Sequence, residues 1–295
     1  MASIRELRGR IKSVGNIKQI TRAMEMVATT KLRRFQDRAV GSRPYTEEIT
    51  GLMAHLAAVL GPEVEKRALF REGTGEGTLV LLVTSDRGLC GAYNTNVFKE
   101  LEAFMAEQQG PVRFLAYGRK GFQYLNKAGY EIEHYFTEPP LESIDYRGAA
   151  RVTKYMVDAF LNGECADAKV LYTAFESVVS YIPTLFELLP VRASSLGAEE
   201  AEEGGDAQPG GDVILEPDPE TIFDELVPRY LETRMYNALV EALTSEYASR
   251  RVSMKNATDA AGDMQTALKS QYNRLRQEGI TKDLLDIVGG AEALR

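Results

Sequence analysis

The chain has 295 residues, of which 44% are hydrophobic and 26% are charged, as in an ordinary soluble globular protein. No purely apolar run is longer than Leu79–Val83, which is far too short to cross a bilayer, so we expect no direct membrane insertion. The two cysteines, Cys90 and Cys165, argue against a disulfide scaffold and indicate a reducing cytoplasm. The first residues lead into charges instead of an apolar core, so no signal peptide is predicted.

The net charge of −8 is unevenly distributed along the chain. Residues 1–43 hold eleven Lys and Arg against three acids, a net of +8, so the remaining residues carry −16. A basic arm of this kind indicates an acidic partner, and nucleic acid is one candidate. However, no aromatic residue lies among these bases before Phe35, and no nucleic-acid-binding motif accompanies them. We therefore predict no nucleic-acid partner, and an acidic protein fits the pattern at least as well.

Residues from about 3 to 58 are predicted to form one long helix, because apolar residues recur at spacings of three and four. The repeat consists of Ile4, Leu7, Ile11 and Val14, followed after a one-residue slip by Ile17, Ile20, Met24 and Val27. A kink is expected at Gly41–Pro44. About 55 helical residues would extend about 80 Å, which exceeds the diameter of a globular domain. We therefore expect this helix to project from the domain or to pair with another helix.

The region 76–192 alternates predicted strands with predicted helices, which indicates an open, largely parallel α/β sheet. The predicted strands are Thr78–Thr84, Val112–Tyr117, Glu131–Phe136 and Ala168–Phe175, with further extended chain to Leu189. The predicted helices are Asn96–Gln108, Arg119–Ala128 and Ala149–Leu161. The next segment, 193–216, contains the acidic, glycine-rich run Ala198–Gly211, which is typical of a flexible surface loop or a disordered insertion.

A second long helix is predicted from Pro217–Glu220, a good helix start with an acidic first turn, to about Val288. Pro228 is expected to kink or restart it. Its apolar and small-residue seam comprises Leu231, Met235, Leu239, Ala242, Ala261, Met264, Leu268 and Leu275. Two such helices, at 1–58 and 217–295, predict an antiparallel coiled coil with the α/β domain inserted between them. The alternative is that each helix lies separately on that domain.

The C-terminal stretch Ile280–Leu294 has an unusual composition for a chain end. Ile280, Leu284, Ile287 and Val288 form an apolar stripe at helical spacing. Because chain ends fray unless something holds them, an apolar tip indicates insertion into a partner. The alternative, that this helix packs back on its own domain, remains open at this point.

The turn after the first predicted strand, Ser85–Ala92, is where an α/β sheet would bind a nucleotide. It lacks both glycine-rich phosphate-binding motifs, so we predict no nucleotide cofactor. Cys90 lies in a small-residue run that faintly resembles a nucleophile elbow, but a thiol nucleophile needs a base. His55 is on the N-terminal helix and His134 is on a strand without an evident acid partner. A buried structural cysteine is therefore the favoured interpretation, and we predict no catalytic residue and no metal site.

Two terminal motifs carry a resemblance to a known family. The run Ile20–Ala28, ITRAMEMVA, and the residues Ile280, Thr281, Asp283 and Gly289–Ala291 resemble the terminal signatures of the gamma subunit of rotary (F-type) ATP synthases of the bacterial type. Asp283 stands where that family usually has Glu, and the resemblance extends over nearly the whole chain. It implies a coiled coil of the two terminal helices with an inserted Rossmann-like domain. It also implies a non-catalytic rotor shaft that transmits torque from the membrane c-ring to a hexamer of alpha and beta subunits, with the catalytic sites on beta.

The resemblance also implies which residues contact partners. Contacts with the hexamer would come from Met24, Arg251, Gln277, Thr281 and Asp283, and from basic residues that face acidic loops of beta, namely Arg8, Arg10, Lys12, Arg33 and Arg34. The alternative for each basic residue is a solvated helix charge. Asp212, Glu216 and Asp218 lie in a segment that resembles the loop meeting the c-ring and the epsilon subunit. The implied location is peripheral, on the cytoplasmic face of the bacterial inner membrane.

Overall fold

The computed structural model describes residues 3–192 and 217–292, so the acidic run expected at Ala198–Gly211 lies outside the described residues. The chain divides into two compact units. The first unit consists of Met1–Thr30 and Arg250–Arg295, and the second is Lys31–Ser249. Both unit boundaries fall inside the long helices α1 (Ile4–Leu60) and α6 (Pro219–Glu292).

The two long helices confirm the predicted elements at both ends of the sequence. Helix α1 has 57 residues and α6 has 74, and each continues through an internal proline, Pro44 in α1 and Pro228 in α6. Asp218 caps the start of α6, because its carboxylate oxygens accept from the backbone N–H and the hydroxyl of Thr221, both at 2.8 Å. These hydrogen bonds lower the pKa of Asp218.

One face of α1 is buried with a strict seven-residue period. Thr21 and Ser42 are half-buried at two positions of this repeat. The other positions are at most 9% exposed and are occupied by Leu7, Val14, Ala28, Phe35, Ile49 and Leu56. This spacing is that of a coiled-coil seam. The apolar residues that the sequence pattern placed after a one-residue slip do not continue the seam, since Ile17, Ile20 and Val27 are 52–59% exposed. The predicted one-residue slip does not occur in the seam, because the seven-residue spacing continues from Val14 through the polar Thr21 to Ala28.

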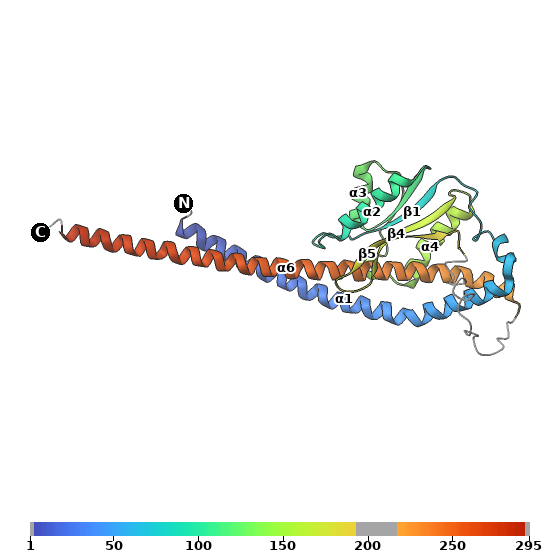
Figure 1. The fold of residues 1–295 in the computed structure, drawn as a ribbon, viewed down its shortest axis with the longest axis horizontal. Coiled ribbons are helices and arrows are strands. Elements are labelled where there is room, and N and C mark those ends of the chain that lie inside the picture. The colour runs from blue at the N-terminus through green and yellow to red at the C-terminus, as the bar shows by residue number, and fades with distance from the viewer. Residues whose placement is uncertain (1–2, 193–216, 293–295) are drawn as a thin grey trace. The chain divides into compact units, whose positions relative to one another are not determined.

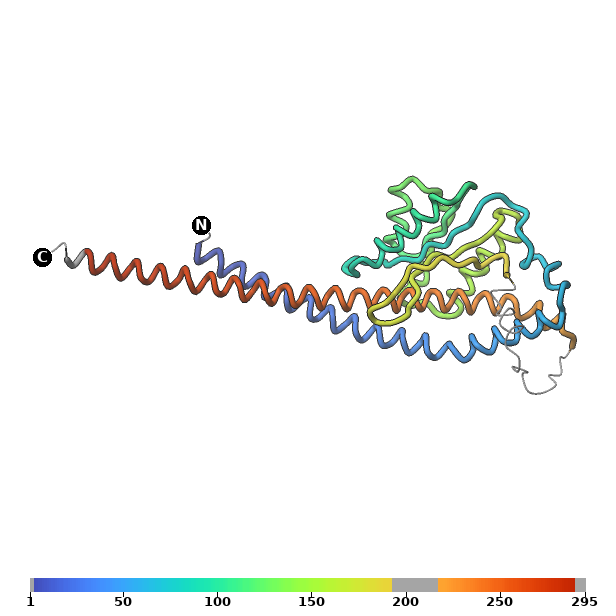
Figure 2. The backbone as a smooth tube through the Cα atoms, in the orientation of Figure 1, coloured from blue at the N-terminus to red at the C-terminus, as the bar shows by residue number. Residues whose placement is uncertain are grey.

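Within the first unit, α1 and α6 run side by side in opposite directions (Figure 2). A Cβ added at Gly15 would lie 2.9 Å from Gln265 Nε2, and one at Gly262 would lie 3.1 Å from Lys18 Nζ. The Thr21 and Thr258 hydroxyl oxygens are 2.8 Å apart. Rising numbers in α1 therefore meet falling numbers in α6, which confirms the antiparallel coiled coil in this unit. Met264, expected in the seam, is 57% exposed, and the buried Met254 and Ala261 take the inward positions.

The second unit contains the inserted sheet, and its elements follow the predicted alternation. The strands are β1 (Thr78–Val83), β2 (Val112–Tyr117), β3 (Ile132–Phe136), β4 (Asp167–Phe175) and β5 (Tyr181–Leu189). The helices are η1 (Gly61–Lys66), α2 (Tyr93–Glu107), α3 (Arg119–Ala128), η2 (Leu141–Ser143) and α4 (Tyr146–Leu161). The sheet order is β3-β2-β1-β4-β5, with β5 antiparallel to β4 and the other neighbours parallel. The predicted open, largely parallel α/β sheet is confirmed.

The sheet lies between two helical layers (Figure 1). On one face, Val80, Leu82 and Leu171 pack in a core with residues of α2 and α3. On the other face, the Tyr172 hydroxyl donates to Glu241 Oε2 of α6 at 3.2 Å. Residues 242–249 of α6 are all buried, which is typical of a helix covered on every side. The sheet is therefore built directly on α6.

Gly118 should be the most restrictive glycine in the inserted domain. Its φ is +110°, and a Cβ there would lie 2.1 Å from the Thr84 carbonyl oxygen. Gly129 also has a positive φ, +78°, but nothing lies within 4 Å of its added Cβ. We predict that Gly129→Ala lowers the free energy of unfolding by about 1 kcal/mol through the left-handed backbone alone. Gly118→Ala should cost at least about 3 kcal/mol, because steric overlap adds to that strain. Urea unfolding followed by near-ultraviolet circular dichroism tests this, and equal losses would contradict it.

The Thr21–Thr258 pair gives a second prediction. Each hydroxyl also lies within hydrogen-bonding distance of a carbonyl of its own helix, that of Lys18 or Met254, so two hydroxyl protons are shared among three contacts. Replacing either threonine with valine removes the hydrogen bond between helices, whereas replacing both restores a matched, apolar contact. We expect a coupling free energy of about 0.5–1.5 kcal/mol in a double-mutant cycle, with the double variant more stable than either single variant. Additive losses in urea unfolding would show that the two hydroxyls do not interact.

Candidate partner-binding surfaces

The turn after β1 is a docking element for α6. Cys90 is 2% exposed, and its sulfur lies 3.4 Å from Asn94 Nδ2 and 3.7 Å from Ser85 Oγ. Its carbonyl oxygen accepts from the Ser249 hydroxyl of α6 at 2.6 Å. His134 stacks on Tyr155 at a centroid distance of 5.2 Å and is not among these contacts. These contacts of Cys90 are those of a structural residue that fixes the turn to α6.

Leu89 is a surface residue that the sequence reasoning missed. It has a positive φ of 65°, which is rare for a residue with a branched side chain, and it is 61% exposed. The turn is held in place because Asn94 Oδ1 accepts from the Ser85 backbone N–H at 3.1 Å. The hydrogen bond from the Ser249 hydroxyl to the Cys90 carbonyl oxygen fixes the turn to α6. An apolar side chain presented in a strained backbone conformation indicates a contact surface. A glycine-rich turn with one leucine was the available signal in the sequence.

The four apolar residues Ile17, Ile20, Met24 and Val27 form what we call the outer stripe of α1. Their spacings of three and four place them on one face of the helix. Met24 is half-buried and the other three are more than half exposed. Since Ile17, Ile20 and Val27 are 52–59% exposed, these three side chains are not buried by the pairing of α1 with α6. Such a stripe on a helix is a candidate interaction surface.

The end of α6 also exposes apolar side chains. Every described side chain from Ile280 to Gly289 is exposed. The large apolar ones are 52–68% exposed and comprise Ile280, Leu284, Leu285, Ile287 and Val288. The predicted contact residues Gln277, Thr281 and Asp283 lie on this same helical segment and are exposed. The side chains of this tip are therefore solvent-facing along its whole described length.

The predicted basic contacts are solvent-facing. Arg8, Arg10 and Lys12 are exposed in the first unit, and Arg10 pairs with Glu6 at 2.8 Å. In the second unit, Arg33 and Arg34 are exposed.

The remaining predicted contacts are dispersed. Arg251, in the first unit, is half-buried. Asp212 and Glu216 lie outside the described residues, whereas Asp218 is the exposed cap of α6. These residues lie on separate stretches of the chain and do not converge on one chemical site.

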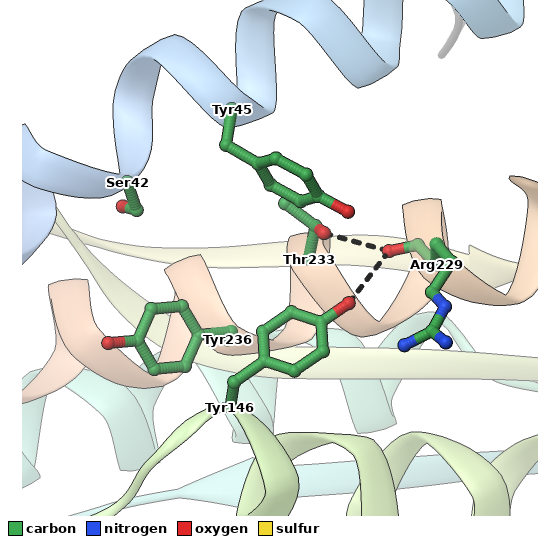
Figure 3. A pocket seen from close by; sticks show the side chains of 6 residues that line it. All are labelled: Ser42, Tyr45, Tyr146, Arg229, Thr233 and Tyr236. Carbon is green, nitrogen blue, oxygen red and sulfur yellow. Dashed lines mark hydrogen bonds between the residues drawn. The ribbon is translucent and has the colours of Figure 1, made fainter.

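A cavity of about 390 Å³ lies in the second unit among α1, α4 and α6 (Figure 3). It is lined by Ser42, Tyr45, Tyr146, Arg229, Thr233 and Tyr236. The hydroxyls of Tyr146 and Thr233 both donate to the Arg229 carbonyl, at 3.4 and 2.7 Å. Burial raises the pKa of Tyr146, which keeps its phenol protonated as a donor. These contacts fix the start of α4 against α6.

None of the helices within 3–192 and 217–292 is both long enough and apolar enough to span a membrane. In the same residues, no group of three or more His, Cys, Asp and Glu side chains is arranged to hold a metal ion.

Comparisons with known proteins match the whole chain. Residues 3–294 match the family described as ATP synthase. The ATP synthase gamma chain of Chloroherpeton thalassium is 38% identical and covers 100% of this chain and 99% of its own length. That of Mycolicibacterium gilvum is 40% identical, with coverage of 99% and 98%.

A solved structure shares the fold. A chain from the Euglena gracilis mitochondrial ATP synthase, in a structure of OSCP, F1 and the c-ring, gives a TM-score of 0.65 at 21% identity. The match covers 99% of this chain and 94% of that one. The full-length sequence matches show that this chain belongs to the ATP synthase gamma chain family.

Proposed function

We propose that this chain is the central rotor shaft of a proton-translocating ATP synthase. It transmits torque between the membrane c-ring and the catalytic hexamer of alpha and beta subunits, and thereby regulates ATP hydrolysis and proton flow. The observation that carries the proposal is the apolar tip of α6, where five large apolar side chains from Ile280 to Val288 are more than half exposed. An exposed apolar surface of this extent indicates that a partner protein covers it in a complex.

The long helices suit the transmission of torque. Helices α1 and α6 each run without a break through both units, so no loop interrupts either helix. One proton crossing 100 mV releases about 2.3 kcal/mol, and the shaft must carry several such increments without unfolding. A continuous hydrogen-bonded helix paired with another resists this load better than a segment of irregular chain.

The partner contacts are part of the same proposal. The tip would insert into the hexamer, with Gln277, Thr281 and Asp283 as its polar contacts. Met24 in the outer stripe and Arg251 would add contacts, and the basic residues Arg8, Arg10, Lys12, Arg33 and Arg34 would face acidic loops of beta. The segment containing Asp212, Glu216 and Asp218 would meet the c-ring and the epsilon subunit.

The catalytic sites belong to beta in this proposal, and the chain itself is non-catalytic. Its location would be peripheral, on the cytoplasmic face of the bacterial inner membrane.

Native mass spectrometry after co-expression with the organism's alpha and beta chains tests the rotor assignment. We expect one copy of this chain in each hexamer, with full ATPase activity in the assembled complex. A stable free monomer that ignores both partners would overturn the assignment.

Charge substitutions test the insertion of the tip. The double variant Leu284→Asp/Ile287→Asp places two carboxylates in the apolar tip, and Ser270→Asp/Asn273→Asp places two on exposed polar positions of the same helix. Burying each apolar side chain contributes about 1.5–3 kcal/mol, so we expect the tip variant to bind the hexamer at least about tenfold more weakly. The control should bind like the wild type in a titration of purified hexamer. Equal effects of the two variants would rule out insertion of this segment.

A further inference from the structure

One carboxylate of the inserted domain contacts both long helices of the second unit. Glu142 lies in η2, between β3 and α4. Its Oε1 forms an ion pair with Lys31 Nζ of α1. Its Oε2 accepts from the Tyr247 hydroxyl of α6 at 2.9 Å and from Arg87 Nη2, in the turn after β1, at 3.0 Å. Four separate elements therefore meet at a single side chain.

The groups around Glu142 are held in place by packing. Leu141 and Ile144 on either side of it are 2% and 1% exposed, which anchors η2 in the inserted domain. The Ile144 carbonyl accepts from Arg38 Nη1 at 3.3 Å, a second bond to α1. The Lys31 ammonium lies 5.5 Å from the ring centroid of Tyr247, within the range of a cation–π contact. Glu142, Lys31 and Tyr247 are thus positioned before any partner binds, whereas the Arg87 side chain is 75% exposed.

The cluster is far from the covalent connection between α1 and the inserted domain. That connection leaves α1 at Leu60, whereas Lys31 lies near the other end of the α1 segment in this unit. From residue 31 to residue 60 the helix rises roughly 44 Å at 1.5 Å per residue. A domain attached to a helix at one end can tilt against it under load. A contact at the opposite end restricts that tilt most, because it acts over the longest lever arm.

We propose that Glu142 is a positioning residue that locks the inserted domain to α1 and α6 so that torque applied to the domain reaches the helices. This rests on the rotor function proposed above. The charge of Glu142 is the active property, because its carboxylate forms ion pairs with both Lys31 and Arg87. The side chains of Lys31 and Glu142 are 30% and 31% exposed, so water screens their attraction only in part.

The test uses the complete ATP synthase in inverted membrane vesicles. Glu142→Gln keeps the shape and the acceptor for Tyr247 but removes the charge, and Lys31→Gln removes the same ion pair from α1. Glu142→Asp retains the carboxylate as the conservative variant. Glu187→Gln is the matched control, since Glu187 pairs with Arg192 inside the inserted domain at 2.7 Å. ATP hydrolysis and ATP-driven proton pumping are measured on the same vesicles.

We expect Glu142→Gln and Lys31→Gln to hydrolyse ATP within about twofold of the wild type while protons pumped per ATP fall at least about twofold. Glu142→Asp should recover most of this ratio, and Glu187→Gln should leave it unchanged. A wild-type ratio in both glutamine variants would overturn the proposal. If Glu142→Gln fails to assemble, Lys31→Gln decides by the same criterion. A wild-type chain absent from the purified synthase would instead refute the rotor function itself.

Discussion

The seven-residue burial repeat of α1 is the constraint on which the rest of the structure depends. A helix of 57 residues cannot bury its apolar side chains against itself, so it needs a partner of comparable length. In the first unit that partner is α6, and the Thr21–Thr258 pair places two polar groups opposite each other in an otherwise largely apolar seam. A polar pair of this kind favours the observed register, because any shift would remove the hydrogen bond between the two helices.

The sheet domain is a second consequence of the same helix. In the second unit, residues 242–249 of α6 are buried and serve as part of the core of an α/β domain. Tyr93 at the start of α2, and Tyr172 and Tyr181 in the sheet, reach polar atoms of α6. These contacts satisfy hydrogen-bonding groups that burial would otherwise leave without a partner. Helix α6 therefore has two roles, as a coiled-coil strand in one unit and as a core helix in the other.

The regular elements could be predicted from the sequence because their periodicities are local. Strand β2 and helix α3 have the predicted bounds, and β1 differs by one residue. The seam of α1 could not be predicted fully, because Ile17 and Ile20 satisfy a helical apolar pattern as well as Leu7 and Val14 do. An apolar pattern predicts that a side chain will be buried, but it does not show whether its own chain or another chain buries it.

The polar contacts were less accessible to sequence reasoning. Glu142 and Lys31 are separated by 111 residues. The local sequence around each one predicts only an ordinary surface charge. The sequence around Cys90 suggested a candidate thiol nucleophile. In the structure, the Cys90 carbonyl oxygen accepts a hydrogen bond from the Ser249 hydroxyl. Contacts between residues distant in sequence depend on the tertiary arrangement, which no local pattern encodes.

The pairing of α1 with α6 also sets the order of events during synthesis. Thr21 and Thr258 are 237 residues apart, so the seam of α1 leaves the ribosome long before its partner exists. At about 5–20 residues per second, the interval is roughly 12–47 s. During that time the repeat that includes Leu7 and Val14 lacks its native cover, and an unpaired amphipathic helix of this kind binds other apolar surfaces. The topology that gives the finished protein two paired helices therefore makes its N-terminal segment a natural client for chaperones while the chain is being made.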